Sequence, residues 1–146
     1  EYSNRILLSV TAFELIHYST GGDVNPAKEE IRNMENDTNL IKRVVNELER
    51  FGIQKNLSGY TFIRKAVLLA YNDFGIVQEI THRLYPTIAE THDSTPSKVE
   101  RCIRHAIDMA TFTSNGLINA TFGRKPTNGQ FIAEIADGLR VEDGII

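Results

Sequence analysis

The side chains best suited to chemistry in this sequence gather between Ser97 and Asp108, and their chemistry is recognition. If this stretch is a helix, in which each residue turns by about 100°, one face is polar: Ser97, Lys98, Glu100, Arg101, Arg104, His105 and Asp108. Arginine can donate two hydrogen bonds to guanine, glutamate can accept from a cytosine amine, and lysine or serine can hold a phosphate. The pattern is typical of a surface that contacts nucleic acid.

Arg101 and Glu100 lie near the start of the expected helix, where side chains can reach base edges. Arg101 is the first choice for base reading because its guanidinium matches guanine O6 and N7. Glu100 can read a cytosine, or it can pair with Arg104 four residues later as a surface acid, and the two roles can coexist. Phosphate or mixed contacts are assigned to Ser97, Lys98, Arg104 and His105.

The opposite face of the same stretch is apolar and predicts how the helix is held. Its members recur at helical spacing: Val99, Cys102, Ile103, Ala106, Ile107 and Ala110. Thr95 can cap the first turn and Pro96 suits the first helical position, so the helix is expected over about 96–110. The single cysteine, Cys102, is interpreted as a small core residue.

A second, shorter helix is expected over 86–92, with Ile88 and Ala89 facing inward and a polar turn at 92–94. Two helices joined by so short a turn are typical of a helix-turn-helix, whose second helix enters a DNA groove. The alternative is an ordinary helical hairpin with a solvated polar face.

Apolar periodicity elsewhere predicts an all-α fold, a compact multi-helix bundle that contains the helix-turn-helix. Helices are expected over 38–51, ended by Gly52, over 58–72, and over 76–84, ended by Pro86. The stretch 111–122 is interpreted as a loop-rich link. A final helix begins near 124–128, with an expected buried side of Phe131, Ile132, Ile135, Ala136 and Leu139.

Two parts are expected along the chain, a leader over 1–36 and a main domain over 37–146. Within the leader we expect an apolar helix between Ile6 and Ile16 and a second short helix that begins at Pro26 and is capped by Asn25. A linker, a dimerisation element and a regulatory arm remain equally open roles for it.

The net charge of −3 is not that of a strongly basic DNA binder, but it is unevenly distributed. Residues 1–37 hold seven acids against three bases, and the rest holds 12 acids against 13 bases. The stretch from Ser97 to Lys125 contains five basic and two acidic residues. Positive charge therefore collects beside the expected reading helix.

Several classes of function are not expected. No run is long or apolar enough to cross a membrane and no signal-peptide pattern is present, so a cytoplasmic protein is predicted. No His, Cys, Asp or Glu spacing suits zinc; His17 and His82 are interpreted as surface or capping residues, and no cofactor is expected. No phosphate-binding glycine loop, activated nucleophile or carboxylate pair suggests an enzyme.

Three runs carry a family resemblance: YNDFGIVQEITHRLYPTIAETH, PSKVERCIRHAIDMA and KPTNGQFIAEIADGLR. From about Asn39 to Val141 the chain resembles the C-terminal effector domain of the stage-zero sporulation protein A family, the master sporulation response regulators. The resemblance implies an all-helical module that binds a TGTCGAA-like box in double-stranded DNA and activates or represses promoters. It implies base reading by Glu100 and Arg101 and a phosphate contact by Lys125, which by itself would be interpreted as a solvated base.

The chain also departs from that family. Thr111-Phe112 stands where family members usually carry a tryptophan, and the link before Lys125 is shorter. This region lies near the surface that the family uses to touch the sigma subunit of RNA polymerase, so the resemblance supports activation less strongly than DNA binding. No receiver domain fits within the leader, so phosphorylation control is not expected within residues 1–146. The oligomeric state stays open, and tandem or inverted boxes would favour a homodimer on DNA.

A second hypothesis comes from a different class. The same fold could serve as a helical protein-interaction module, or an antagonist, without useful DNA affinity. The weak overall charge favours it, since phosphate neutralisation supplies much of the affinity for DNA.

Overall fold

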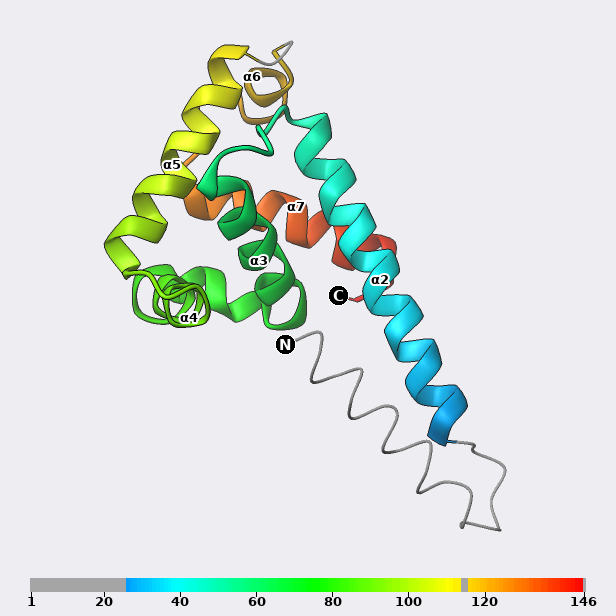
Figure 1. The fold of residues 1–146 in the computed structure, drawn as a ribbon. Coiled ribbons are helices and arrows are strands. Elements are labelled where there is room, and N and C mark those ends of the chain that lie inside the picture. Colours follow the sequence, from blue (N-terminus) through cyan, green and yellow to red (C-terminus); the bar gives the residue numbers. More distant parts are fainter. Residues whose placement is uncertain (1–25, 114–115, 146) are drawn as a thin grey trace. The chain divides into compact units, whose positions relative to one another are not determined.

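The computed structural model describes residues 26–113 and 116–145, and within these ranges every regular element is helical. The elements are α2 (Pro26–Arg50), α3 (Ser58–Asn72), the 3₁₀ segment η1 (Phe74–Glu79), the π segment η2 (Ile80–Leu84), α4 (Tyr85–Thr91), α5 (Pro96–Thr113), α6 (Leu117–Phe122) and α7 (Asn128–Glu142) (Figure 1). The predicted all-α class is confirmed.

The chain divides into two compact units, residues 1–41 and 42–146. Helix α2 passes through the boundary, so its first part belongs to one unit and its last part to the other. In the first unit the exposed positions of α2 are mostly polar, and Ile31 is an exposed exception. The predicted leader helix between Ile6 and Ile16 and the Asn25 cap lie outside the described residues.

The core of the second unit forms where α3, α5 and α7 pack together. Its largest fully buried side chains come from α2, the turn after it, α3, η2, α4, α5, α6 and α7: Leu48, Phe51, Ile63, Leu84, Ile88, Ile103, Ile107, Ile118, Phe131 and Ile132. The apolar faces predicted for the helices at 58–72, 96–110 and 128–142 are buried, apart from Cys102, which is half-buried. Phe51 and Phe131 meet edge to face, with ring centroids 5.3 Å apart.

Helix α3 approaches α5 unusually closely at Gly59. A methyl group built on Gly59 would lie 2.1 Å from the carbonyl oxygen of Cys102 and 2.7 Å from the Cβ of Ala106. These distances are far inside van der Waals contact, so only glycine fits there. The backbone of α3 at Gly59 therefore packs directly against α5.

The first two predicted helices of the described chain were wrong in detail. The helices expected from Pro26 and over 38–51 form one continuous α2, because the segment between them contains no glycine or proline. Thr38 lies inside this helix and donates its hydroxyl to the Met34 carbonyl at 2.9 Å. Gly52, with φ of 80°, ends α2 as predicted.

The helix expected over 76–84 is instead a 3₁₀ segment followed by a π turn. The backbone N–H of Tyr85 donates to the Ile80 carbonyl, five residues back. A wider turn relieves the clash that the Pro86 ring would make with the preceding α-helical turn, so the chain enters α4 without the predicted break.

The stretch 111–122 was also wrongly predicted as loop-rich. Helix α5 continues to Thr113, and residues 117–122 form the short helix α6. Gly116, with φ of 82°, precedes α6, and its carbonyl accepts from the Ala120 N–H at 2.9 Å. Six residues are too few to show a helical period in a sequence, which explains the error.

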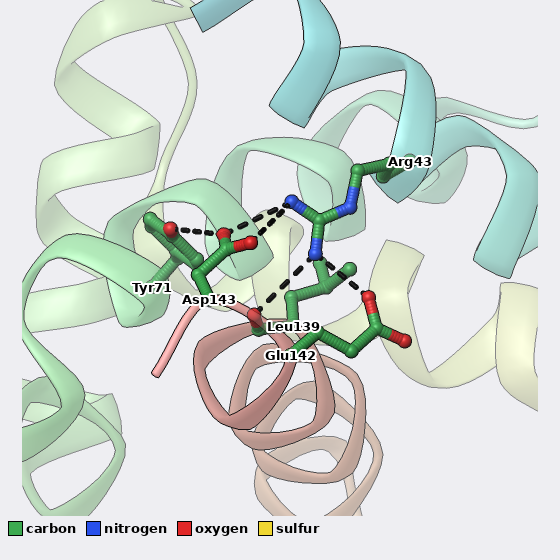
Figure 2. A network of polar contacts seen from close by, with 5 residues as sticks. All are labelled: Arg43, Tyr71, Leu139, Glu142 and Asp143. Atoms are coloured by element: carbon green, nitrogen blue, oxygen red, sulfur yellow. Dashed lines mark hydrogen bonds and ion pairs between the residues drawn. The ribbon is translucent and has the colours of Figure 1, made fainter. Parts of the chain in front are cut away.

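A polar network fastens the end of α7 to α2 and α3 (Figure 2). The Arg43 guanidinium donates to both oxygens of Asp143, at 2.9 and 3.0 Å, and to Glu142 at 2.7 Å. The Tyr71 hydroxyl also donates to Asp143. All four residues belong to the second unit, so the network fixes the C-terminal end of α7 within it.

The network predicts a pH-dependent contribution to stability. Hydrogen bonds from Arg43, and then Tyr71, hold the pKa of Asp143 below its ordinary value of 3.8. A carboxyl with a lowered folded-state pKa stabilises the fold above the unfolded-state pKa and loses this effect as the pH falls through the folded-state pKa. Asp143→Asn should therefore lower the Tm near neutral pH, and the difference should shrink below about pH 4.

Thermal unfolding of the parent and Asp143→Asn from about pH 2 to pH 7 measures this difference. Asp137→Asn, which removes an exposed acid from the same helix, is the control and should leave the pH profile of the Tm nearly unchanged. A constant Tm difference between parent and Asp143→Asn across this range would contradict the assignment.

Candidate nucleic-acid interface

Helices α4 and α5 form the predicted helix-turn-helix. The turn after α4 closes with the Ser94 N–H donating to the Ala89 carbonyl at 2.9 Å, and Asp93 takes a left-handed conformation with φ of 49°. Thr95 accepts from the Lys98 N–H at 3.2 Å, so the predicted cap is present. Helix α5 begins at Pro96 as predicted.

The two faces of α5 separate as the sequence indicated. Five of the seven polar side chains are exposed: Ser97, Lys98, Arg101, Arg104 and His105. Glu100 and Asp108 are half-buried at the edge of this face. In Figure 1, α5 leads away from α4 along one side of the second unit, with α6 near its far end. The polar face is therefore open to a large ligand.

Arg101 and its neighbours on α5 differ in their hydrogen-bond and ion-pair partners. Among the residues that the structure describes, the Arg101 guanidinium has no hydrogen-bond or ion-pair partner. Glu100 and Arg104 form the ion pair expected at this spacing, with N and O 3.3 Å apart and side chains 34% and 52% exposed. An exposed pair of this kind is weak and readily exchanged. Arg101 is thus free to meet a ligand, and Glu100 becomes free by a small rearrangement.

Lys125 lies next to α5, which its position in the sequence could not show. Its ammonium forms an ion pair with Asp108, a member of the polar face. Half of the Lys125 side chain remains exposed. The segment before α7 therefore adds a base to the edge of the surface formed by α5.

The start of α7 is firmly capped beside this base. The Thr127 hydroxyl accepts from the Gln130 N–H at 3.1 Å, and the Gln130 side chain accepts from the Thr127 N–H at 3.0 Å. This reciprocal capping box leaves the N–H groups of Asn128 and Gly129 without intrahelical partners, as in the first turn of any helix. Such groups favour an anion.

A groove of about 840 Å³ joins these features along one side of α5. Glu100 and Arg104 line one wall, Lys125 and the first turn of α7 line another, and Ile80 and Tyr85 contribute as well. Much of the lining is apolar, from Val77, Ile80 and Pro126 among others. At its polar edge the groove combines two cationic side chains with a helix N-terminus, and this edge suits a phosphate group.

One buried polar residue of the site was missed by the sequence reasoning. The Asn128 amide is buried and donates to the Tyr85 hydroxyl at 3.0 Å and to the Glu100 carbonyl at 3.1 Å. Burial raises the pKa of the Tyr85 hydroxyl above its usual value, so it stays protonated. Asn128 follows a threonine cap and resembles an ordinary helix start in the sequence, so no local pattern marks it.

The described residues contain no group of three or more His, Cys, Asp or Glu side chains that could hold a metal ion. Within the same ranges no helix has the length and apolar character needed to cross a membrane. His82 is exposed on η2 and Cys102 is half-buried on α5. His17 lies outside the described residues.

Comparison with protein-family models matches residues 44–139 to the family described as "Sporulation initiation factor Spo0A C terminal". The chain belongs to this family. The match confirms the resemblance, and the family is the DNA-binding effector domain of a sporulation response regulator. It contains α4, α5, the capped start of α7 and every candidate site residue, whereas residues 1–43 lie outside it.

Proposed function

We propose that this chain binds double-stranded DNA sequence-specifically and regulates transcription, with α5 in the major groove. The observation that carries the proposal is the exposed polar face of α5, with Arg101 unpaired among the described residues, on a capped helix-turn-helix. An α-helix fits the width of the major groove, and this arrangement presents the first turns of the second helix to base edges.

Two residues are proposed to read bases and five to hold the backbone. Arg101 donates to guanine, and Glu100, after leaving Arg104, accepts from a cytosine amine. The remaining contacts, to phosphates or to both phosphates and bases, are made by Ser97, Lys98, Arg104, His105 and Lys125. Arg104 and Lys125 line one groove, so a single stretch of DNA backbone can meet both.

Further partners belong to the same proposal. The expected target is a TGTCGAA-like box in cytoplasmic DNA, with a homodimer where two boxes are paired. For contact with a sigma subunit, the relevant surface is the far end of α5. There Phe112 is 85% exposed, at the place where family members usually carry tryptophan. A single exposed aromatic side chain is ordinary on a protein surface, so the position of Phe112 in the family, and not its exposure, supports this part of the proposal.

The test is equilibrium binding of the protein to a TGTCGAA-containing duplex and to a scrambled duplex, each titrated over salt concentration. We expect tighter binding to the box at every salt concentration, and affinity that falls steeply on both duplexes as salt rises. Equal affinity for the two duplexes would refute sequence-specific binding.

A protein-interaction module is the second candidate, and the ion pairs of the site favour it. Glu100 and Asp108 already neutralise Arg104 and Lys125 in the free protein, and the net charge is −3. Both features reduce the attraction to phosphate. Weak and equal binding to both duplexes, with little response to salt, is the outcome that supports this candidate.

A further inference from the structure

We propose that Asn128 is a positioning residue for recognition: it fixes both helices of the helix-turn-helix to the start of α7 and so sets how α5 meets DNA. This inference rests on the proposed DNA binding. It adds to the base-reading and phosphate-binding residues one whose side chain bonds only to Tyr85 and Glu100 and yet determines specificity.

The geometry gives Asn128 two partners in two different elements. One amide hydrogen points to the Tyr85 hydroxyl at the first residue of α4, and the other points to the Glu100 carbonyl in α5. An asparagine amide has two N–H donors, and here each serves one helix. A carbonyl has two lone pairs, so Glu100 can accept this bond together with its bond inside the helix.

Burial increases the free-energy cost of losing either of these two hydrogen bonds. Asn128 is 9% exposed and Tyr85 is 6% exposed, so only the small part of each residue that lines the groove is open to water. A buried polar group that loses its partner bears the full cost of desolvation. The two helices are therefore held at defined positions relative to α7, beyond what apolar packing alone specifies.

The first turn of α7, which contains Asn128, is itself held in place. Thr127 and Gln130 close the capping box around it, and Phe131 anchors the next turn in the core. The far end of α7 is fastened by the network of Arg43, Tyr71 and Asp143 (Figure 2). Helix α7 is thus fixed at both ends, and Asn128 transmits that fixed position to α4 and α5.

The held carbonyl belongs to one of the proposed base-reading residues. Glu100 and Arg101 leave the same turn of α5, so movement of the Glu100 backbone moves both side chains. Recognition geometry tolerates only about 0.5 Å of displacement. Contacts to phosphate by long, exposed lysine and arginine side chains tolerate more. Loss of Asn128 should therefore reduce discrimination between sequences more than it reduces general affinity.

The experiment measures affinity for a TGTCGAA-containing duplex and a scrambled duplex with the parent, Asn128→Ala and Tyr85→Phe. Asn128→Ala should reduce the preference for the box by about tenfold, with affinity for the scrambled duplex and its salt dependence nearly unchanged. Tyr85→Phe removes one of the two bonds and should produce a smaller loss of preference. Asn72→Ala is the matched control, because it removes an asparagine-to-carbonyl bond at the end of α3.

Two measurements on the free variants complete the test. Thermal unfolding identifies the temperature at which each variant is folded, and amide hydrogen exchange reports protection along α4 and the first half of α5. Asn128→Ala should exchange faster there than the parent, whereas Asn72→Ala should not. If Asn128→Ala does not fold, Tyr85→Phe decides the matter with the same readouts.

The outcomes separate the two proposals. If a folded Asn128→Ala keeps the parental preference for the box, with only its Tm lowered, Asn128 is merely structural and the inference is overturned. If the parent itself shows no preference, the proposed function fails, and hydrogen exchange alone decides whether Asn128 positions α5. Unchanged exchange in that case overturns the positioning role as well.

Discussion

Arg101→Ala is expected to remove discrimination at one base pair of the target box. A bidentate contact between arginine and guanine distinguishes bases by about 1–3 kcal/mol, which is roughly a factor of 5 to 150 in affinity. Arg101 has no partner among the described residues, and its side chain is exposed on a helix whose opposite face is packed against the core. The substitution should therefore leave the fold intact, and its effect on affinity can be attributed to the lost contact.

The measurement is competition binding against a panel of duplexes in which each base pair of the box is changed in turn. For the parent, one position should show a penalty that Arg101→Ala lacks. Lys125→Ala should instead weaken binding to every duplex similarly and reduce the salt slope by about 1. Lys55→Ala removes an exposed charge from the segment between α2 and α3 and serves as the control. A uniform loss for both Arg101→Ala and Lys125→Ala would contradict the division between reading and holding residues.

The residues of the site that lie on α5 could be predicted from the sequence. Residues on one face of α5 repeat at the helical period, and Thr95 with Pro96 marks its start, so the polar face and its apolar counterpart followed from local pattern. Pairing of Glu100 with Arg104 followed from the same spacing. Helical periodicity, capping and pairing at i, i+4 depend only on residues that are close in the sequence. They were therefore sufficient for the features that lie within α5.

The remaining features depend on residues that are distant in the sequence. Lys125 reaches Asp108 and Asn128 reaches Tyr85 only because α7 returns beside α4 and α5. The π turn before Pro86 reflects how the chain accommodates that proline, and regular periodicity does not reveal it. The domain boundary at 36/37 stays a prediction; the compact units divide at 41/42 inside a continuous helix, and the family match begins at 44.

Gly59→Ala is the substitution for which we expect the largest loss of stability. A Cβ at this position would meet the carbonyl oxygen of Cys102 at 2.1 Å and the carbonyl carbon at 2.8 Å. Both atoms belong to the α5 backbone, so no side-chain rotation relieves the clash, and α3 and α5 must separate. Overpacking of this kind costs about 1–3 kcal/mol and sometimes more, and the short distance places Gly59→Ala at the upper end. Separation also displaces the reading helix, so the preference for the box should fall even where the variant is folded.

Gly138→Ala is the matched control, because its effect should have the opposite sign. Gly138 lies inside α7, and a methyl group added there would have no neighbouring atom within 4 Å. Alanine should therefore raise stability by about 0.5–1 kcal/mol through its better helix propensity. Urea unfolding of the parent and the two variants measures both free-energy changes. If Gly59→Ala were as stable as Gly138→Ala, α5 would not be seated on the α3 backbone, and the close contact at Gly59 would not contribute to the position of the reading helix.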